Sequence, residues 1–207
     1  MVEAGAAAPS RSGATLFRSI GELAELCGHY CWVERRLFEV SGARASAPVS
    51  GDPEPGDPEV RVVLSEMSAR HGFLAAQWRD RLPVRAGVDA DALIAPPAGP
   101  AGEALDLIES ESRLLLVLGG LAGQFLPRLL DGYARHLALA SPVSEGPVRA
   151  VLECAALSAN REIGRARTLL PGGFESGGRA GSAGDSSPLV QRLLGQGADI
   201  FPAARAS

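Results

Sequence analysis

The sequence predicts an all-α protein, an antiparallel four-helix bundle followed by a short extra C-terminal helix. Four long stretches repeat apolar residues at helical spacing, and no run alternates apolar and polar residues as a strand does. The 207 residues, of which 46% are hydrophobic and 21% charged, are enough to bury one substantial core. We therefore expect one folded domain at residues 14–170.

The first two helices are expected at residues 14–45 and from Asp57 to near Pro83. The first follows the alternating four-three spacing of a bundle seam, with Leu16, Ile20, Leu23, Cys27, Tyr30 and Leu37 in that series. Asp57 and Pro58 open the second helix as an N-cap and a first-turn proline. Its buried stripe contains Val60, Val63, Met67, Leu74 and Trp78.

The second half of the chain predicts a long connection and two more helices. Residues 83–103 are rich in helix breakers, although 89–94 are expected to form a helical turn. The third helix is expected at 106–140, where Gly119 and Gly120 permit close packing and Pro127 introduces a kink. The fourth begins at 144–147 and ends at Pro171.

The two ends of the chain lie outside this bundle. Residues 1–13 lack a secretory signal, which requires a basic and then an apolar region, so we expect a flexible N-terminus and a cytoplasmic protein. Glycine and serine dominate residues 171–187, as in a linker. Residues 188–207 form a short C-terminal amphipathic segment, which docks on the bundle or on a partner.

Charge and composition exclude several functions. A net charge of -4 and a pI near 5.5 make nucleic acid an unfavourable partner. All 20 basic residues are arginine, which excludes Schiff-base chemistry on lysine and a Walker-type phosphate loop. The apolar run at residues 114–126 is too short to span a membrane, so we expect a buried helix there. Cys27, Cys31 and Cys154 are interpreted as small core residues.

Ionisable residues interrupt the apolar stripes. Glu34 continues the stripe of the first helix and His71 that of the second. A helix rises about 1.5 Å per residue, so the two fall at similar heights in an antiparallel hairpin. A buried carboxylate needs a partner, and the sequence leaves open whether that partner is an arginine on a neighbouring helix or a functional site. We expect burial to raise the pKa of Glu34 and lower that of His71.

The direction of the long connection decides which other residues join them. A connection that crosses the bundle lengthwise brings Glu162 to this level, and the third helix then adds only apolar residues and glycines. A connection that returns locally brings Tyr133, His136 and Glu153 instead. The candidate catalytic residues are thus Glu34, His71, Tyr133 and His136, and the candidate substrate-binding residues are Tyr30, Trp32, Met67, Trp78 and Glu162.

Three segments carry a resemblance to a known family. They are residues 31–39 (CWVERRLFE), Arg70-His71 with residues 78–83, and residues 133–142 (YARHLALASP). They resemble uncharacterised actinobacterial proteins of the ferritin-like superfamily over roughly residues 15–170. The resemblance implies a ferritin-like bundle, and in di-iron members a glutamate such as Glu34 and a Glu-x-x-His histidine such as His71.

The di-iron motif is incomplete in this chain. Ser68 stands three residues before His71, Glu66 has the wrong spacing, and Arg165 takes the histidine position after Glu162. A complete di-iron centre is therefore not expected. A single metal ion held by Glu34, His71 and one more carboxylate, from the candidates Glu66 and Glu162, remains open.

Three functions are compatible with this pattern. The favoured one is a tailoring enzyme of secondary metabolism that uses acid and base catalysis on a small hydrophobic substrate. The second is a non-haem iron oxygenase. The third is a non-catalytic ligand-binding or scaffold protein that forms a homodimer. The cofactor expectation is accordingly none or iron.

Overall fold

The computed structural model describes residues 18–48, 57–84, 86–87, 89–170 and 200–201. Within these ranges the chain is helical and contains no strand, which confirms the all-α prediction. The predicted N-terminal segment 1–13, the linker 171–187 and most of the C-terminal segment 188–207 lie outside the described residues.

The first helix, α1, spans Ile20–Ser46 and begins at a capping box. Ser19 Oγ accepts a hydrogen bond from the backbone N–H of Glu22, and the Glu22 carboxylate accepts one from the backbone N–H of Ser19. This reciprocal pair satisfies N–H groups that have no partner inside the helix. The observed start is therefore six residues later than predicted from the apolar pattern alone.

Helix α2, Asp57–Arg79, packs antiparallel against α1. Ser68 Oγ donates a hydrogen bond to the carbonyl oxygen of Phe38, 3.0 Å away, near the end of α1. Toward the other end of α2, Cys31 Sγ lies 3.4 Å from the carbonyl oxygen of Ala75. The sequence numbers rise on one helix as they fall on the other, so α1 and α2 form the predicted hairpin.

The connection after α2 contains the 3-10 turn η1, Asp91–Leu93, and helix α3, Ala101–Ser110. The turn lies within the predicted residues 89–94. Helix α3 had been expected as the beginning of a helix at 106–140, but it starts earlier and ends at Ser110. An extended Glu111 follows it.

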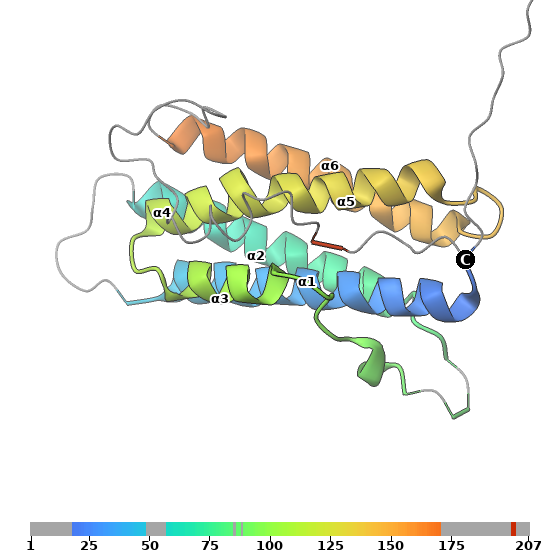
Figure 1. Cartoon of the computed structure of the whole chain (residues 1–207). Coiled ribbons are helices and arrows are strands. Elements are labelled where there is room, and N and C mark those ends of the chain that lie inside the picture. Colours follow the sequence, from blue (N-terminus) through green and yellow to red (C-terminus); the bar gives the residue numbers. More distant parts are fainter. Residues whose placement is uncertain (1–17, 49–56, 85, 88, 171–199, 202–207) are drawn as a thin grey trace, which may run out of the picture.

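This connection runs lengthwise along α1. His29 Nδ1 lies 3.0 Å from the carbonyl oxygen of Ala95, and Arg36 donates to the Asp106 carboxylate at 2.9 Å. The contacts advance in the same direction on both segments, so η1 and α3 follow α1 from its N-terminal half toward its end (Figure 1). Of the two directions left open by the sequence, the lengthwise one is observed.

A second long helical run contains α4 (Leu114–Leu118), a π-helix η2 (Gly119–Phe125) and α5 (Leu126–Leu139). The single predicted helix at 106–140 is therefore wrong in detail. Pro127 lacks a backbone N–H, and its ring excludes the carbonyl four residues earlier, so the wider π spacing accommodates it.

Helix α6, Gly146–Leu169, matches the predicted fourth helix and packs antiparallel to both α2 and α5. On the α2 side, Arg70 Nε donates to the Glu162 carboxylate at 2.7 Å. On the α5 side, Arg149 donates to the carbonyl oxygen of Leu137 at 2.9 Å. The long helices α1, α2, α5 and α6 thus surround a common interior.

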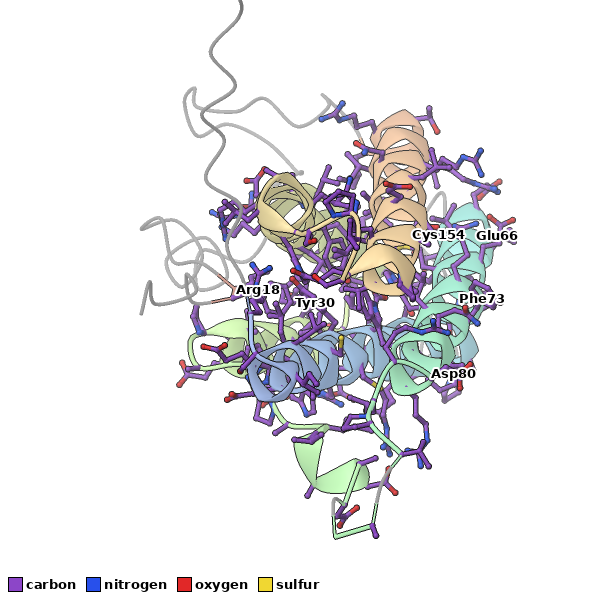
Figure 2. All side chains as sticks on the ribbon, turned by 90° about the vertical axis from the view of Figure 1, so that its right-hand side faces the viewer. Arg18, Tyr30, Glu66, Phe73, Asp80 and Cys154 are labelled. Carbon is purple, nitrogen blue, oxygen red and sulfur yellow. The ribbon has the colours of Figure 1, made fainter. Side chains whose placement is uncertain are left out.

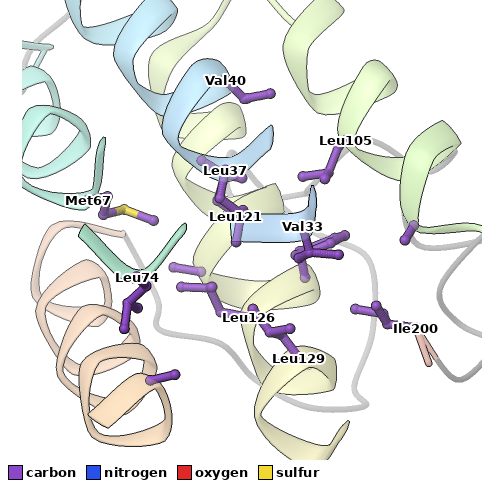
Figure 3. Close-up of a cluster of buried hydrophobic side chains, with 14 of the residues drawn as sticks. Val33, Leu37, Val40, Met67, Leu74, Leu105, Leu121, Leu126, Leu129 and Ile200 are labelled. Atoms are coloured by element: carbon purple, nitrogen blue, oxygen red, sulfur yellow. The ribbon is translucent and has the colours of Figure 1, made fainter. Parts of the chain in front are cut away.

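The core of this interior is aliphatic along most of its length. Figure 3 shows side chains from several helices converging on it: Val33, Leu37, Val40, Met67, Leu74, Leu105, Leu121, Leu126, Leu129 and Ile200. Burying each large aliphatic side chain contributes about 1.5–3 kcal/mol. The few buried polar side chains, among them Glu34 and His71, interrupt this apolar core.

The run Leu114–Leu139 is long and apolar enough, by length and composition, to cross a membrane. Its most apolar window has a mean hydropathy of 1.4, and 56% of that window is buried inside the protein. Leu121, Phe125 and Leu129 are fully buried against the other helices. The run therefore has the packing of a core helix, as the sequence predicted for residues 114–126.

The contact between η1 and α1 can be tested at Gly28. A Cβ atom there would lie 2.0 Å from the carbonyl oxygen of Leu93, so Gly28→Ala should lower the free energy of unfolding by about 1–3 kcal/mol. Gly164 on the exposed face of α6 has no atom near its Cβ position, and Gly164→Ala should raise stability by about 0.5–1 kcal/mol. Urea unfolding of both variants measures this. Equal effects would contradict the close approach of η1 to α1.

Candidate functional site

Glu34 on α1 and His71 on α2 meet in the interior, as their axial levels predicted. Both side chains are fully buried, and Glu34 Oε2 lies 2.5 Å from His71 Nδ1. This separation is that of a strong, charge-assisted hydrogen bond. The polar interruptions of the two apolar stripes therefore satisfy each other.

Glu162 on α6 flanks the other side of the same imidazole. Its Oε2 lies 3.1 Å from His71 Nε2, in an ion pair whose angles fall outside those of a hydrogen bond. Its Oε1 accepts a hydrogen bond from Arg70 Nε at 2.7 Å, and Arg70 reaches partly into solvent. Glu162 is thus the carboxylate that a lengthwise connection was predicted to bring here.

Tyr133 on α5 joins the group from the fourth side. Its hydroxyl donates to Glu34 Oε1 at 2.5 Å, and its ring is fully buried. The expectation that a lengthwise connection leaves only apolar residues and glycines opposite Glu34 is wrong. We call Tyr133, Glu34, His71, Glu162 and Arg70 the Glu34 network.

The electrostatics of this network keep His71 protonated. Burial by itself lowers the pKa of His71, but the carboxylates of Glu34 and Glu162 outweigh it and raise this pKa to about 10. The expectation of a lowered pKa for His71 is therefore wrong, because the sequence did not show that two carboxylates flank the ring. Burial raises the pKa of Glu162, and His71 and Arg70 reverse this and hold it below its usual value.

A second polar group lies one helical turn away and is built on His136. The Tyr30 hydroxyl lies 3.0 Å from His136 Nδ1, and His136 Nε2 lies 2.9 Å from Glu145 Oε2. Arg18 Nη1 pairs with the same carboxylate oxygen at 3.3 Å. We call Tyr30, His136, Glu145 and Arg18 the Glu145 network.

The protonation of His136 differs from that of His71. Burial lowers the pKa of His136, although the hydrogen bond to Glu145 opposes this shift. A neutral imidazole carries one N–H, and the Glu145 carboxylate can only accept, so His136 Nε2 donates to it. His136 Nδ1 is then the acceptor for the Tyr30 hydroxyl.

The sequence analysis missed two members of this network, Arg18 and Glu145. Glu145 stands directly before Gly146 and Pro147, where it was taken as part of a helix start. It is 3% exposed, and it also accepts a hydrogen bond from the backbone N–H of Ser141. Its spacing of nine residues from His136, across a turn between two helices, was the available signal.

The two networks meet at their tyrosines. The rings of Tyr30 and Tyr133 lie edge to face with centroids 5.2 Å apart. The Trp78 ring lies beside both, with its centroid 4.7 Å from that of Tyr30 and 6.3 Å from that of Tyr133. In the end-on view of Figure 2, Tyr30 lies between the helices, in the interior of the molecule. Two phenol groups thus lie side by side, each bonded to a different proton acceptor.

Some predicted site residues lie elsewhere. Trp32 is half-buried on another face of α1, against Gly102 of α3. Glu66 pairs with Arg165 at 2.5 Å on the outer side of α2 and α6 (Figure 2). Met67 is buried one turn from His71 and belongs to the aliphatic core. These three residues do not join the two networks.

The cysteine prediction is correct for two residues and wrong for the third. Cys27 and Cys31 are buried, and burial raises the pKa of the Cys27 thiol to about 12. Cys154 is exposed on α6, on the side shown in Figure 2. One face of α6 is open to solvent at that position, and the sequence pattern had not distinguished it.

The donor atoms do not fit an iron ion as they are placed. Glu34 and Glu162 bind opposite nitrogens of His71, so the three side chains do not converge on one point. Among the described residues, no group of three or more His, Cys, Asp or Glu side chains is arranged to hold a metal ion.

Comparison with known proteins adds no relative to this picture. No protein-family model, no curated protein and no solved structure matches the chain. The resemblance to ferritin-like proteins therefore stays a prediction from three short segments.

The ionisation of His71 predicts a pH dependence of stability. Its pKa is near 6.5 in the unfolded chain and about 10 in the folded one. The stabilisation is complete below pH 6.5 and is lost as pH rises through 10. Between pH 7 and 8.5, we expect the free energy of unfolding to fall by about 1.4 kcal/mol per pH unit. Urea unfolding across this range measures the slope.

Glu34→Gln should flatten this slope, because it removes the leading attractive charge on His71. Glu153→Gln is the matched control, since that carboxylate is exposed and pairs only weakly with Arg149 at 3.9 Å. The control should keep the slope of the unmodified protein. An unmodified protein without a slope would contradict a protonated His71, and an unchanged slope in Glu34→Gln would contradict Glu34 as the leading charge that holds this proton.

Proposed function

We propose that this protein is an enzyme that moves protons on a small hydrophobic molecule. One observation carries the proposal: the Tyr30 and Tyr133 rings lie 5.2 Å apart, and each hydroxyl is bonded to a network of opposite protonation. Behind these hydroxyls, the pKa of His71 is raised and the pKa of His136 is lowered, and such a pair of opposed environments is what acid and base catalysis requires. The reaction removes a proton from one position of the substrate and adds one at another, as in keto–enol isomerisation.

The Glu145 network supplies the base. Neutral His136 accepts the proton of the Tyr30 hydroxyl as the Tyr30 oxygen takes a proton from the substrate. Glu145 holds the Nε2–H of His136 and stabilises the imidazolium that forms. This is the logic by which a carboxylate and a histidine activate a hydroxyl group. Arg18 keeps the charge of Glu145 compensated.

The Glu34 network supplies the acid. The Tyr133 hydroxyl donates its proton to the substrate, and the protonated His71 restores it through Glu34. To complete the cycle, His136 releases to water the proton taken from the substrate, and His71 regains one from water; Glu162 and the partly exposed Arg70 lie on the solvent side of His71. In this proposal Tyr30 and Tyr133 are the catalytic residues that touch the substrate, while Glu34, His71 and His136 transfer protons behind them.

The cost of these networks supports a functional role over a purely structural one. Each ion removed from water costs several kcal/mol, and apolar residues of similar volume often serve stability equally well. The surroundings of the tyrosines are aromatic and aliphatic, which favours a small hydrophobic substrate. A place in secondary metabolism rests on the actinobacterial resemblance alone.

The finer fold assignment belongs to the same proposal. We infer a ferritin-like four-helix bundle from α1, α2, the α4–α5 run and α6. Antiparallel contacts between neighbouring helices and a connection that crosses lengthwise support it, since ferritin-like folds have one such connection. A cytoplasmic location and a homodimer are further parts of the proposal.

Two other functions remain as alternatives to this one. A scaffold or binding protein would use the buried ion pairs only to fix the packing of its helices. A non-haem iron oxygenase would need Glu34, His71 and Glu162 to turn toward one point. Neither alternative accounts for two adjacent tyrosines with differently protonated partners.

Deuterium exchange tests the proposal without knowledge of the natural substrate. We would incubate the full chain in D₂O with small hydrophobic ketones, enones and β-dicarbonyl compounds and follow deuterium uptake by mass spectrometry. The unmodified protein should accelerate exchange into at least one of them. Tyr30→Phe and Tyr133→Phe should each lower that rate by about 100-fold or more, because each removes one proton carrier.

The pH profile and a surface variant provide the controls. Exchange should rise as pH passes the lowered pKa of His136 and should fall as pH approaches 10, where His71 loses its proton. Glu153→Gln should leave the rate unchanged. The proposal is overturned if no compound exchanges faster with the protein than in buffer, or if both tyrosine variants exchange at the original rate.

A further inference from the structure

Phe201 covers both catalytic tyrosines. Its ring lies edge to face with Tyr30, with centroids 4.6 Å apart and an interplanar angle of 75°. It lies nearly parallel to Tyr133, at 6.4 Å and 21°. Phe201 is 4% exposed, and the neighbouring Ile200 is fully buried in the core cluster (Figure 3).

The backbone of α5 leaves room for this ring at Gly132. A Cβ atom at Gly132 would lie 2.7 Å from Cδ2 of Phe201, closer than atoms of real side chains approach. The absence of a side chain on Gly132 therefore lets a flat ring lie against α5 beside Tyr133. The space between Gly132 and the two tyrosine rings thus fits a planar group.

Phe201 differs from the other rings around Tyr30. Trp78, Tyr133 and His136 belong to long helices, which hold them by packing along their whole length. Phe201 belongs to the described pair Ile200–Phe201, which is not part of a helix. Within the described part of the chain, Phe201 is therefore the one ring of this cluster that no helix holds in place.

We propose that the position of the Phe201 ring is a binding site for a planar, uncharged ring of about phenyl size, which replaces Phe201 between Tyr30 and Tyr133. The proposal rests on the function proposed above, because a substrate ring in this position would contact both tyrosine rings, as the Phe201 ring does. Phe201 holds the site closed when the ligand is absent.

The charges of the two networks define the ligand class. In the Glu34 network, two carboxylates balance protonated His71 and Arg70. In the Glu145 network, the single carboxylate balances Arg18, and His136 is neutral. A charged ligand would lose its hydration without gaining a counterion, so the site favours an uncharged one. The edge-to-face arrangement with Tyr30 favours an aromatic ring over a saturated one.

Phe201→Ala in the full chain tests the site directly, with 4-fluorobenzyl alcohol as the probe. Removing the Phe201 ring removes the competitor, so the variant should bind the probe at least about tenfold more tightly than the unmodified protein. ¹⁹F NMR measures binding, and contacts between probe and tyrosine ring protons in NOE spectra locate it. Two further compounds should bind at least about tenfold more weakly than the probe: benzoate, because it is charged, and cyclohexylmethanol, because its ring is not planar.

Phe125→Ala is the matched control, because it empties a phenyl-sized volume at another fully buried position. The proposal is overturned if Phe201→Ala binds the probe no better than Phe125→Ala, or if the probe does not contact Tyr30 and Tyr133.

Should Phe201→Ala not fold, a second experiment replaces it, with 4-fluorophenylalanine at position 201 of the otherwise unmodified chain. Benzyl alcohol should then shift the ¹⁹F signal toward that of an exposed ring, and an unchanged signal overturns the proposal.

This experiment separates the site from the proposed function. Binding between the tyrosines without deuterium exchange in any compound would leave the site standing and remove the acid and base function. Exchange that Tyr30→Phe abolishes, together with no binding at the Phe201 position, would leave the function standing and remove the site.

Discussion

The structure depends on one constraint: Glu34 lies out of water and must find partners for its charge. It finds them on two other helices, as a hydrogen-bond acceptor for His71 of α2 and for Tyr133 of α5. His71 in turn requires Glu162 of α6, which requires Arg70 at the surface. This sequence of requirements fixes the rotation of all four helices about their axes, because a turn of any one would leave a buried charge without a partner. Aliphatic packing alone does not provide such specificity, since many arrangements bury similar area.

The same constraint sets the chemistry. Two carboxylates around one imidazole make His71 retain its proton. Burial lowers the pKa of His136, whose one carboxylate partner is also paired with Arg18, so His136 is neutral. Two histidines in one small interior thus hold opposite protonation states. Tyr30, which is bonded to His136, and Tyr133, which is bonded to the Glu34 carboxylate beside His71, are in ring contact. A structural ion-pair network explains the first histidine well. It does not explain why Tyr30 of the Glu145 network is in ring contact with Tyr133 of the Glu34 network. This contact between the two networks is the basis of the proposed proton transfer.

Helical spacing was enough to predict the all-α class, the α1–α2 hairpin and the meeting of Glu34 with His71, because each depends on periodicity along one or two neighbouring helices. It was not enough where the result depends on contacts distant in sequence. The direction of the pKa shift at His71 follows from Glu34 together with Glu162, and Glu162 lies 91 residues after His71 in the chain. The inclusion of Glu145 follows from the turn between α5 and α6. The predicted helix at 106–140 failed for a local reason: Pro127 changes the hydrogen-bond spacing of the preceding turn, and the chain is extended at Glu111. The lengthwise connection, left open by the sequence, brings Arg36 onto α3 and so places α4 beside α2.

The ¹⁵N NMR shifts of the histidine rings at pH 7 test this account most directly, because they report protonation at each nitrogen. The chain has only three histidines, so His71→Gln and His136→Gln variants suffice for assignment. The account predicts a doubly protonated ring for His71, and for His136 a neutral ring that carries its proton on Nε2. The same protonation state for both rings, or a proton on Nδ1 of His136, would contradict it.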